Sequence, residues 1–242
     1  IPERSEIRET LAELWDYPYH GSPVKKGNRY FYNENSGLQN QNVIYIKENL
    51  SSEAEIFFDP NLLSEDGSVE MGDPKLSPDG EQFAYTLSKG GTDWRTVHFK
   101  QVATKEDYSD ILEYTKFPDV SWTHDNLGVF YVRYPLKDGQ VQSMNSKVYY
   151  HRLNTTQDKD ILIAEFPLNP KWSLGVEISD CGKYVMVTTE ENFQANSVHI
   201  ASLEDNPIDR NFKNNFVAIF PSVDEARYSV SGFCIRTLSV YG

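Results

Sequence analysis

Hydrophobic and polar residues alternate along most of this chain in short runs, and a polar turn that ends in glycine precedes four of them. The four glycines are Gly27, Gly80, Gly128 and Gly182, so the steps between them are 53, 48 and 54 residues. The alternating runs that follow lie at 29–32, 82–85, 129–132 and 183–186. Because glycine readily takes the positive φ of a tight turn, the pattern predicts a turn and then a β-strand at each position.

Each repeat contains further strands. A second β-branched and aromatic run follows in all four repeats, and a third closes the first three, at 56–58, 111–112 and 161–163. Short apolar stretches also precede two of the turns, at 120–122 and 176–178. Four short antiparallel strands in a unit of about 50 residues are typical of a β-propeller blade. We therefore predict an all-β fold, a partial β-propeller of about four blades, in preference to a β-sandwich whose hairpins would not recur so regularly.

The two ends of the chain differ from the repeats. Residues 1–18 predict a short amphipathic helix, because Ile7, Leu11, Leu14 and Trp15 fall on one helical face, and this face must be buried against the propeller or a second domain. Residues 19–205 hold the blades. Residues 206–242 form a divergent tail, in which 216–220 could supply a late fourth closing strand and so part of a blade.

Composition narrows the class of partner. The 242 residues carry a formal net charge of −13, which argues against a nucleic acid or an anionic membrane surface as partner. No run of 18 apolar residues occurs, so we expect no membrane span. Two cysteines, Cys181 and Cys234, predict reduced thiols of a cytoplasmic protein. The chain begins with Ile1 instead of Met, so we expect a missing upstream segment, and a lost signal peptide stays open.

Motifs of catalysis and metal binding are absent from the sequence. It contains no Gly-x-Ser-x-Gly, His-Glu-x-x-His, P-loop or Cys-x-x-Cys motif. Its five histidines show no ligand spacing, and three of them (His98, His151 and His199) lie in or beside predicted strands, where a packed histidine is the ordinary interpretation. We predict no catalytic residue, no metal and no cofactor in this chain.

Several stretches are more specific than a general propeller pattern. The most specific is Ser36-Gly-Leu-Gln-Asn-Gln41, and the others are Trp15-Asp-Tyr-Pro18, Lys25-Lys-Gly-Asn-Arg-Tyr-Phe-Tyr32, Phe58-Asp-Pro-Asn61, Ser121-Trp-Thr-His-Asp125 and Ala164-Glu-Phe-Pro167. In this order and spacing they resemble the N-terminal part of the prolyl oligopeptidase family, over about residues 1–205.

The resemblance implies a role without implying activity. In that family a seven-bladed propeller caps an α/β-hydrolase domain, which carries a Ser-Asp-His triad and cleaves short peptides after proline. This chain lacks the hydrolase domain, so we predict that it is inactive alone. Its contribution would be to admit short proline-containing peptides and to exclude folded proteins.

The family's propeller also lends side chains to a mainly apolar substrate pocket. Phe117 matches the pocket phenylalanine of the family, and an aromatic wall suits such a site. Two further pocket positions fall on Ser173 and Phe193, where the family commonly has methionine and cysteine, so the resemblance implies an altered pocket. A blade-core role for Phe117 and plain loop roles for Ser173 and Phe193 are the alternatives.

Two other functions stay open at this point. One is a non-catalytic β-propeller that binds a peptide or protein partner, which a stable fold without a hydrolase domain would favour. The other is an independent hydrolase with its site on propeller loops, which the lack of clustered carboxylates or histidines makes the weakest of the three.

Overall fold

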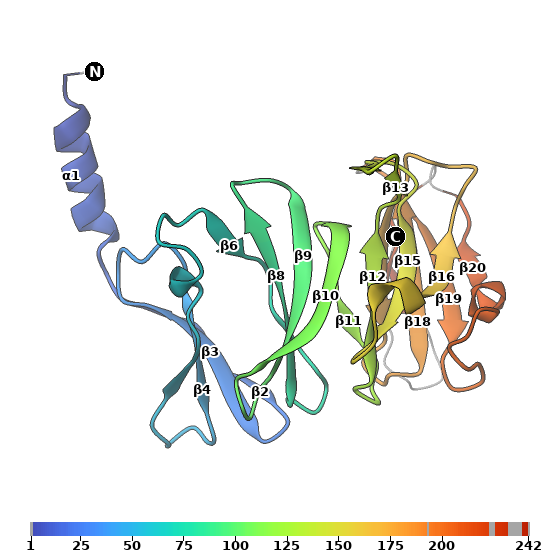
Figure 1. The fold of residues 1–242 in the computed structure, drawn as a ribbon, viewed down its shortest axis with the longest axis horizontal. Coiled ribbons are helices and arrows are strands. Elements are labelled where there is room, and N and C mark those ends of the chain that lie inside the picture. Colours follow the sequence, from blue (N-terminus) through green and yellow to red (C-terminus); the bar gives the residue numbers. More distant parts are fainter. Residues whose placement is uncertain (1, 193, 223–225, 232–238, 242) are drawn as a thin grey trace.

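In the described part of the chain, four larger antiparallel sheets follow one another in chain order, and one α-helix lies at the N-terminal side (Figure 1). The structure is a computed structural model that describes residues 2–192, 194–222, 226–231 and 239–241. Its helix, α1, spans Arg4–Trp15. Each sheet is an antiparallel meander in which four main strands pair in chain order. The predicted all-β fold with about four propeller blades is therefore confirmed.

Blades 1 and 2 are each built from five strands. The strand order is β1-β3-β4-β5 in blade 1, with β2 also on β3, and β10-β9-β8-β6 in blade 2, with β7 also on β8. The bounds in blade 1 are β1 Tyr19–His20, β2 Val24–Lys26, β3 Arg29–Asn35, β4 Val43–Lys47 and β5 Glu55–Phe58. Those in blade 2 are β6 Val69–Met71, β7 Lys75–Leu76, β8 Gln82–Lys89, β9 Trp94–Gln101 and β10 Asp107–Lys116.

Blades 3 and 4 each have four strands, in the orders β11-β12-β15-β16 and β17-β18-β19-β20. The bounds in blade 3 are β11 Ser121–Trp122, β12 Gly128–Arg133, β15 Lys147–Arg152 and β16 Ile161–Glu165. Those in blade 4 are β17 Ser173–Ile178, β18 Tyr184–Glu190, β19 Ser197–Ser202 and β20 Val217–Phe220. The late fourth strand expected at 216–220 is thus present as β20, paired with β19.

The remaining elements are short. Two further hairpins join β13 Leu136–Lys137 to β14 Gln140–Val141 and β21 Ser229–Ser231 to β22 Ser239–Tyr241. Three 3₁₀ turns complete the described elements: η1 Pro60–Leu62, η2 Gln157–Lys159 and η3 Phe212–Asn215. The sequence pattern predicts none of the short strands β1, β2, β6, β7, β13, β14, β21 and β22.

Hydrophobic side chains fill the spaces between successive blades. Phe31 and Phe57 of blade 1 pack with Phe83 of blade 2, and both Phe31 and Phe83 contact Phe57 edge to face. Two larger clusters repeat this arrangement between blades 2 and 3 and between blades 3 and 4. Because successive sheets bury their facing sides against each other, the core is a series of inter-blade layers.

The turns that begin three of the blades share one geometry. In each turn a backbone N–H donates a hydrogen bond to the carbonyl oxygen of the residue five positions later. The donor and acceptor residues are Ser77 and Gln82, Thr123 and Gly128, and Ser179 and Tyr184. The left-handed position of these turns is Gly80, Asn126 and Gly182, with φ of 75°, 59° and 75°. In blade 3 the repeat glycine is therefore not the turn residue: Gly128 lies two positions later in β12, where a Cβ would overlap the carbonyl oxygen of His151.

We expect Gly80→Ala to lower the free energy of unfolding by about 1–3 kcal/mol, because Gly80 has φ of 75° and a Cβ there would lie 2.6 Å from the carbonyl oxygen of Lys26. Gly139 is the matched control, since it has the same φ of 75° but open space around a Cβ. Urea denaturation would measure both variants. Equal losses at the two sites would mean that the contact between the blade 1 and blade 2 turns contributes nothing.

The helix α1 does not bury its apolar face on the propeller. It has no buried residue, and Ile7, Leu11, Leu14 and Trp15 are all at least half exposed. Figure 1 shows the helix extending away from the sheets. The sequence predicts that either the propeller or a second domain buries this helix face. The described residues of the propeller do not bury it.

The state of Cys181 differs from the prediction. Cys181 is disulfide-bonded, so the prediction of a reduced thiol is wrong for this residue, while Cys234 lies outside the described residues. The cysteines therefore no longer support a cytoplasmic location. In the part of the chain that the structure describes, no helix is long and apolar enough to cross a membrane.

Candidate functional site

A cleft of about 620 Å³ lies where blades 2, 3 and 4 meet, and it contains both described residues that the sequence placed in a pocket. Phe117 comes from the end of blade 2 and Ser173 from the start of β17 in blade 4. Blade 3 adds Val132 and Tyr134. The third predicted residue, Phe193, lies outside the described residues. Phe117 and Ser173 are 56 positions apart in sequence, and the propeller fold brings them to one cleft.

Irregular pairing at the end of β10 presents Phe117 to solvent. The register of β10 on β9 shifts between Leu112 and Thr115, and Tyr114 within this bulge has a φ of 62°. The buried Thr115 hydroxyl then donates to the carbonyl oxygen of Arg95 at 2.6 Å, which fixes the strand just before Phe117. Phe117 is 68% exposed, which excludes the blade-core alternative.

The backbone of Phe117 is strained. Its φ of 46° lies in the left-handed region, which a bulky side chain rarely takes and which costs on the order of 1–3 kcal/mol. The Lys116 ammonium lies 5.6 Å from the centre of the Phe117 ring and 5.9 Å from that of Trp94. Strained backbone of this kind is found more often at functional sites than elsewhere in proteins.

Another part of the cleft wall comes from the chain that follows blade 4. The side-chain amide of Asn196 donates to the carbonyl oxygen of Tyr228 at 2.8 Å and accepts from its backbone N–H at 2.5 Å. Tyr228 also stacks on Phe220 with the ring centres 3.9 Å apart. Asn196 and Tyr228 both line the cleft. No pattern in the sequence points to Tyr228, because it lies in the segment predicted as a divergent tail.

Charged groups at the edge of the cleft are mostly paired. Glu190 contacts Arg227 at 3.1 Å, and Asp119 contacts Lys75 at 3.6 Å. Glu177 forms no ion pair within the described residues, and partial burial raises the pKa of its carboxyl group, with the negative charges of Asp119 and Asp180 raising it further. The cleft therefore offers aromatic and apolar surface with a polar edge, which suits a peptide.

The described lining of the cleft carries the carboxylates of Asp119, Glu177 and Glu190 but no imidazole or thiol. No histidine or cysteine is among the described residues that line it. In the described part of the chain no group of three His, Cys, Asp or Glu residues is arranged to hold a metal ion.

The comparison with known proteins decides the family. Residues 1–233 match the family model described as prolyl oligopeptidase, N-terminal beta-propeller domain. The chain belongs to the prolyl oligopeptidase family. The match continues beyond residue 205, where the resemblance read from the motifs ends, so the family pattern extends into the segment predicted as a divergent tail.

Individual relatives agree with the family match. The chain is 33% identical to Prolyl oligopeptidase A of Amanita bisporigera, over 96% of this chain and 34% of that protein. It is 32% identical to Prolyl endopeptidase of Elizabethkingia meningoseptica, over 93% and 31%. A structure of Prolyl oligopeptidase B from Galerina marginata, bound to a 35mer hydrolysis and macrocyclization substrate, superposes with a TM-score of 0.84 at 26% identity, over 96% and 35%. The chain thus spans about a third of the length of these relatives.

Proposed function

We propose that this chain is the substrate-gating propeller part of a serine-type endopeptidase that cleaves short peptides after proline. The observation that carries the proposal is the convergence of Phe117 and Ser173, from two different blades, on one cleft. Its volume of about 620 Å³ matches the usual size of a site for a small ligand. The nucleophile, base and oxyanion hole would come from an α/β-hydrolase domain outside this chain.

The division of labour has a physical reason. A propeller over a hydrolase site excludes folded proteins by size, and it shields the acyl chemistry from bulk water. An exposed aromatic ring such as Phe117 gives a flexible peptide a large apolar contact at little cost in side-chain entropy. In this account the propeller selects and positions the peptide, and the hydrolase domain cleaves it.

The alternative is a non-catalytic propeller that binds a peptide or protein partner through the same cleft. The absence of histidine and cysteine from its described lining is compatible with either function. One observation distinguishes the two functions. The substrate-gating function requires that changes in the cleft alter hydrolysis of proline peptides by a form that carries the hydrolase domain.

Ser173→Met tests this requirement. A methionine would add apolar surface to the cleft that Phe117 also lines, so we expect KM to fall by about 2- to 10-fold for proline peptides with a large apolar neighbouring residue. The KM for peptides with glycine at that place should change little. Thr156→Met, at an exposed site beside η2 and away from the cleft, is the matched control. An unchanged ratio of the two KM values in a folded Ser173→Met enzyme would contradict the proposal.

A further inference from the structure

A buried polar cluster joins blade 2 to blade 3. The Nδ1 of His151 lies 2.7 Å from a carboxylate oxygen of Asp160, and its Nε2 lies 3.0 Å from a carboxylate oxygen of Asp110. His151 is on β15 of blade 3 and Asp110 is on β10 of blade 2. All three side chains are 1% exposed. We refer to Asp110, His151 and Asp160 as the buried latch.

The geometry suits a charged histidine. Against two carboxylates, whose oxygens only accept hydrogen bonds, both ring nitrogens of His151 donate, which makes the ring an imidazolium. Asp160 also accepts from the Tyr131 hydroxyl at 2.6 Å, and Asp110 accepts from the backbone N–H of Asn154 at 2.6 Å. The other oxygen of Asp110 is buried without a hydrogen-bond partner among the described residues.

The surroundings of the latch contain little else that titrates. Tyr131 faces it from β12 and Tyr108 from β10, and burial, followed by the nearby carboxylates, raises the pKa of both hydroxyls. Arg133 interacts with Tyr131 from β12. Within the described residues, no lysine or arginine forms an ion pair with Asp110 or Asp160. His151 is therefore the positive charge that holds the two carboxylates.

The titration of His151 has a definite sign. Burial lowers its pKa, but the hydrogen bonds and charges of Asp160 and Asp110 outweigh it and raise the pKa above the ordinary value. A raised pKa in the folded state means that the contribution to stability is complete below about pH 6.5 and is lost as the pH rises through the folded-state pKa. Loss of the proton leaves a ring nitrogen facing a carboxylate with nothing to donate.

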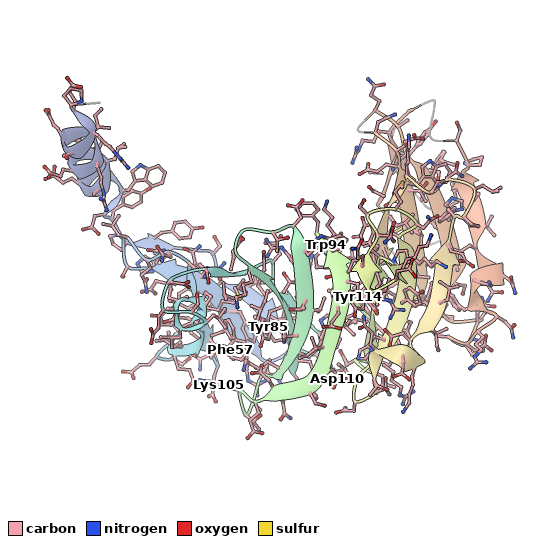
Figure 2. All side chains as sticks on the ribbon, turned by 45° about the horizontal axis from the view of Figure 1, so that its top comes forward. Phe57, Tyr85, Trp94, Lys105, Asp110 and Tyr114 are labelled. Carbon is pink, nitrogen blue, oxygen red and sulfur yellow. The ribbon has the colours of Figure 1, made fainter. Side chains whose placement is uncertain are left out.

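The same strand that enters the latch carries Phe117 to the cleft. Asp110 lies within β10, and Phe117 directly follows the strand's last residue, Lys116. Between them the backbone N–H of Tyr134 in blade 3 donates to the carbonyl oxygen of Tyr114 at 2.8 Å. In Figure 2, Asp110 lies low on β10, whereas Tyr114 and Trp94 lie higher, toward the ends of β10 and β9. Moving β10 against blade 3 would therefore move the wall of the cleft.

We propose that the buried latch holds β10 against blade 3 and thereby sets the position of Phe117 in the cleft, and that an alkaline shift in pH releases it. Asp110, His151 and Asp160 are thus positioning residues for the cleft. The inference goes beyond the proposed function, because it concerns the geometry of the cleft and does not depend on which peptide binds there.

Tryptophan side chains report on both ends of β10. Trp122 packs edge to face on Phe99 at 5.8 Å, and Phe99 stacks on the His151 ring at 5.9 Å. Trp94 packs on Tyr134, a residue of the cleft, at 5.4 Å. Fluorine NMR of protein labelled with 5-fluorotryptophan, recorded from pH 6 to 10, would follow both. We expect the two resonances to shift with one common midpoint above about pH 6.5.

Variants separate the latch from other titrations. His151→Gln should abolish the common shift and lower Tm at pH 6 by on the order of 10 °C, with the loss shrinking as the pH rises. His199→Gln is the matched control, because His199 is a half-buried strand histidine that has no carboxylate partner among the described residues, and burial lowers its pKa. It should retain the shift. If His151→Gln does not fold, Asp110→Asn, which removes one of the two negative charges, should lower the midpoint.

Three results would overturn the proposal. The first is a common shift that persists in His151→Gln, or an unchanged midpoint in Asp110→Asn. The second is a Trp122 resonance that moves while Trp94 stays still, which would show a latch without effect on the cleft. The third is loss of the shift in His199→Gln. Failure of peptide binding at every pH would instead contradict the proposed function and leave these fluorine signals unaffected.

Discussion

The Phe99→Ala variant is expected to lose about 3–5 kcal/mol of its free energy of unfolding. Phe99 on β9 is fully buried in the layer between blades 2 and 3, where it contacts Trp122 and His151. Truncation would open a cavity that two rigid sheets cannot collapse to fill, so the cost of the cavity adds to the lost burial. Urea denaturation monitored by circular dichroism would measure the change.

Two further variants make this test specific. Phe117→Ala removes the same atoms from a residue that is 68% exposed, so its stability should change by no more than about 0.5 kcal/mol. Phe99→Leu keeps most of the volume and should cost about 1 kcal/mol. Equal losses in Phe99→Ala and Phe117→Ala would contradict an architecture in which the core lies in layers between blades.

The second large effect concerns function. In a form that carries the hydrolase domain, Phe117→Ala should raise KM for short proline peptides by about 10-fold or more and change kcat little, because the aromatic ring contributes binding surface and takes no part in bond breaking. Steady-state kinetics with a fluorogenic proline peptide would measure both constants.

The control is an exposed aromatic residue outside the cleft. Tyr184 on β18 is 41% exposed and does not line the cleft, so Tyr184→Ala should leave KM unchanged. Hydrolysis by Phe117→Ala that equals the parent would remove Phe117 from the pocket. A loss of kcat alone would assign Phe117 to the arrangement of the domains instead of the binding of the peptide.

Local pattern was sufficient to predict the blades. The alternating runs after Gly27, Gly80 and Gly182 are strands, since period-2 burial and tight turns are properties of neighbouring residues. Blade 3 shows the limit of this reasoning. There Asn126 takes the left-handed position, and Gly128 is required by a contact with the partner strand β15, which no local pattern displays.

The site depended on contacts between distant segments. The family resemblance, and no local pattern, predicts that Phe117 and Ser173 line a pocket. Neither the backbone strain at Phe117 nor the part of the cleft wall formed by Tyr228 follows from residue spacing. His151 was interpreted as an ordinary packed histidine, because its partners Asp110 and Asp160 lie 41 and 9 positions away. A histidine with two buried carboxylates becomes visible only when the blades are placed side by side.

The most direct test of the account is the mass of the native protein, by immunoblot of source material with an antibody against the blades. The account predicts a band about three times heavier than the 27.8 kDa of this chain, because the chain spans 34% of Prolyl oligopeptidase A. Such a band would carry the hydrolase domain that the substrate-gating role requires. A band at 27.8 kDa alone would contradict that role and favour the non-catalytic binding propeller.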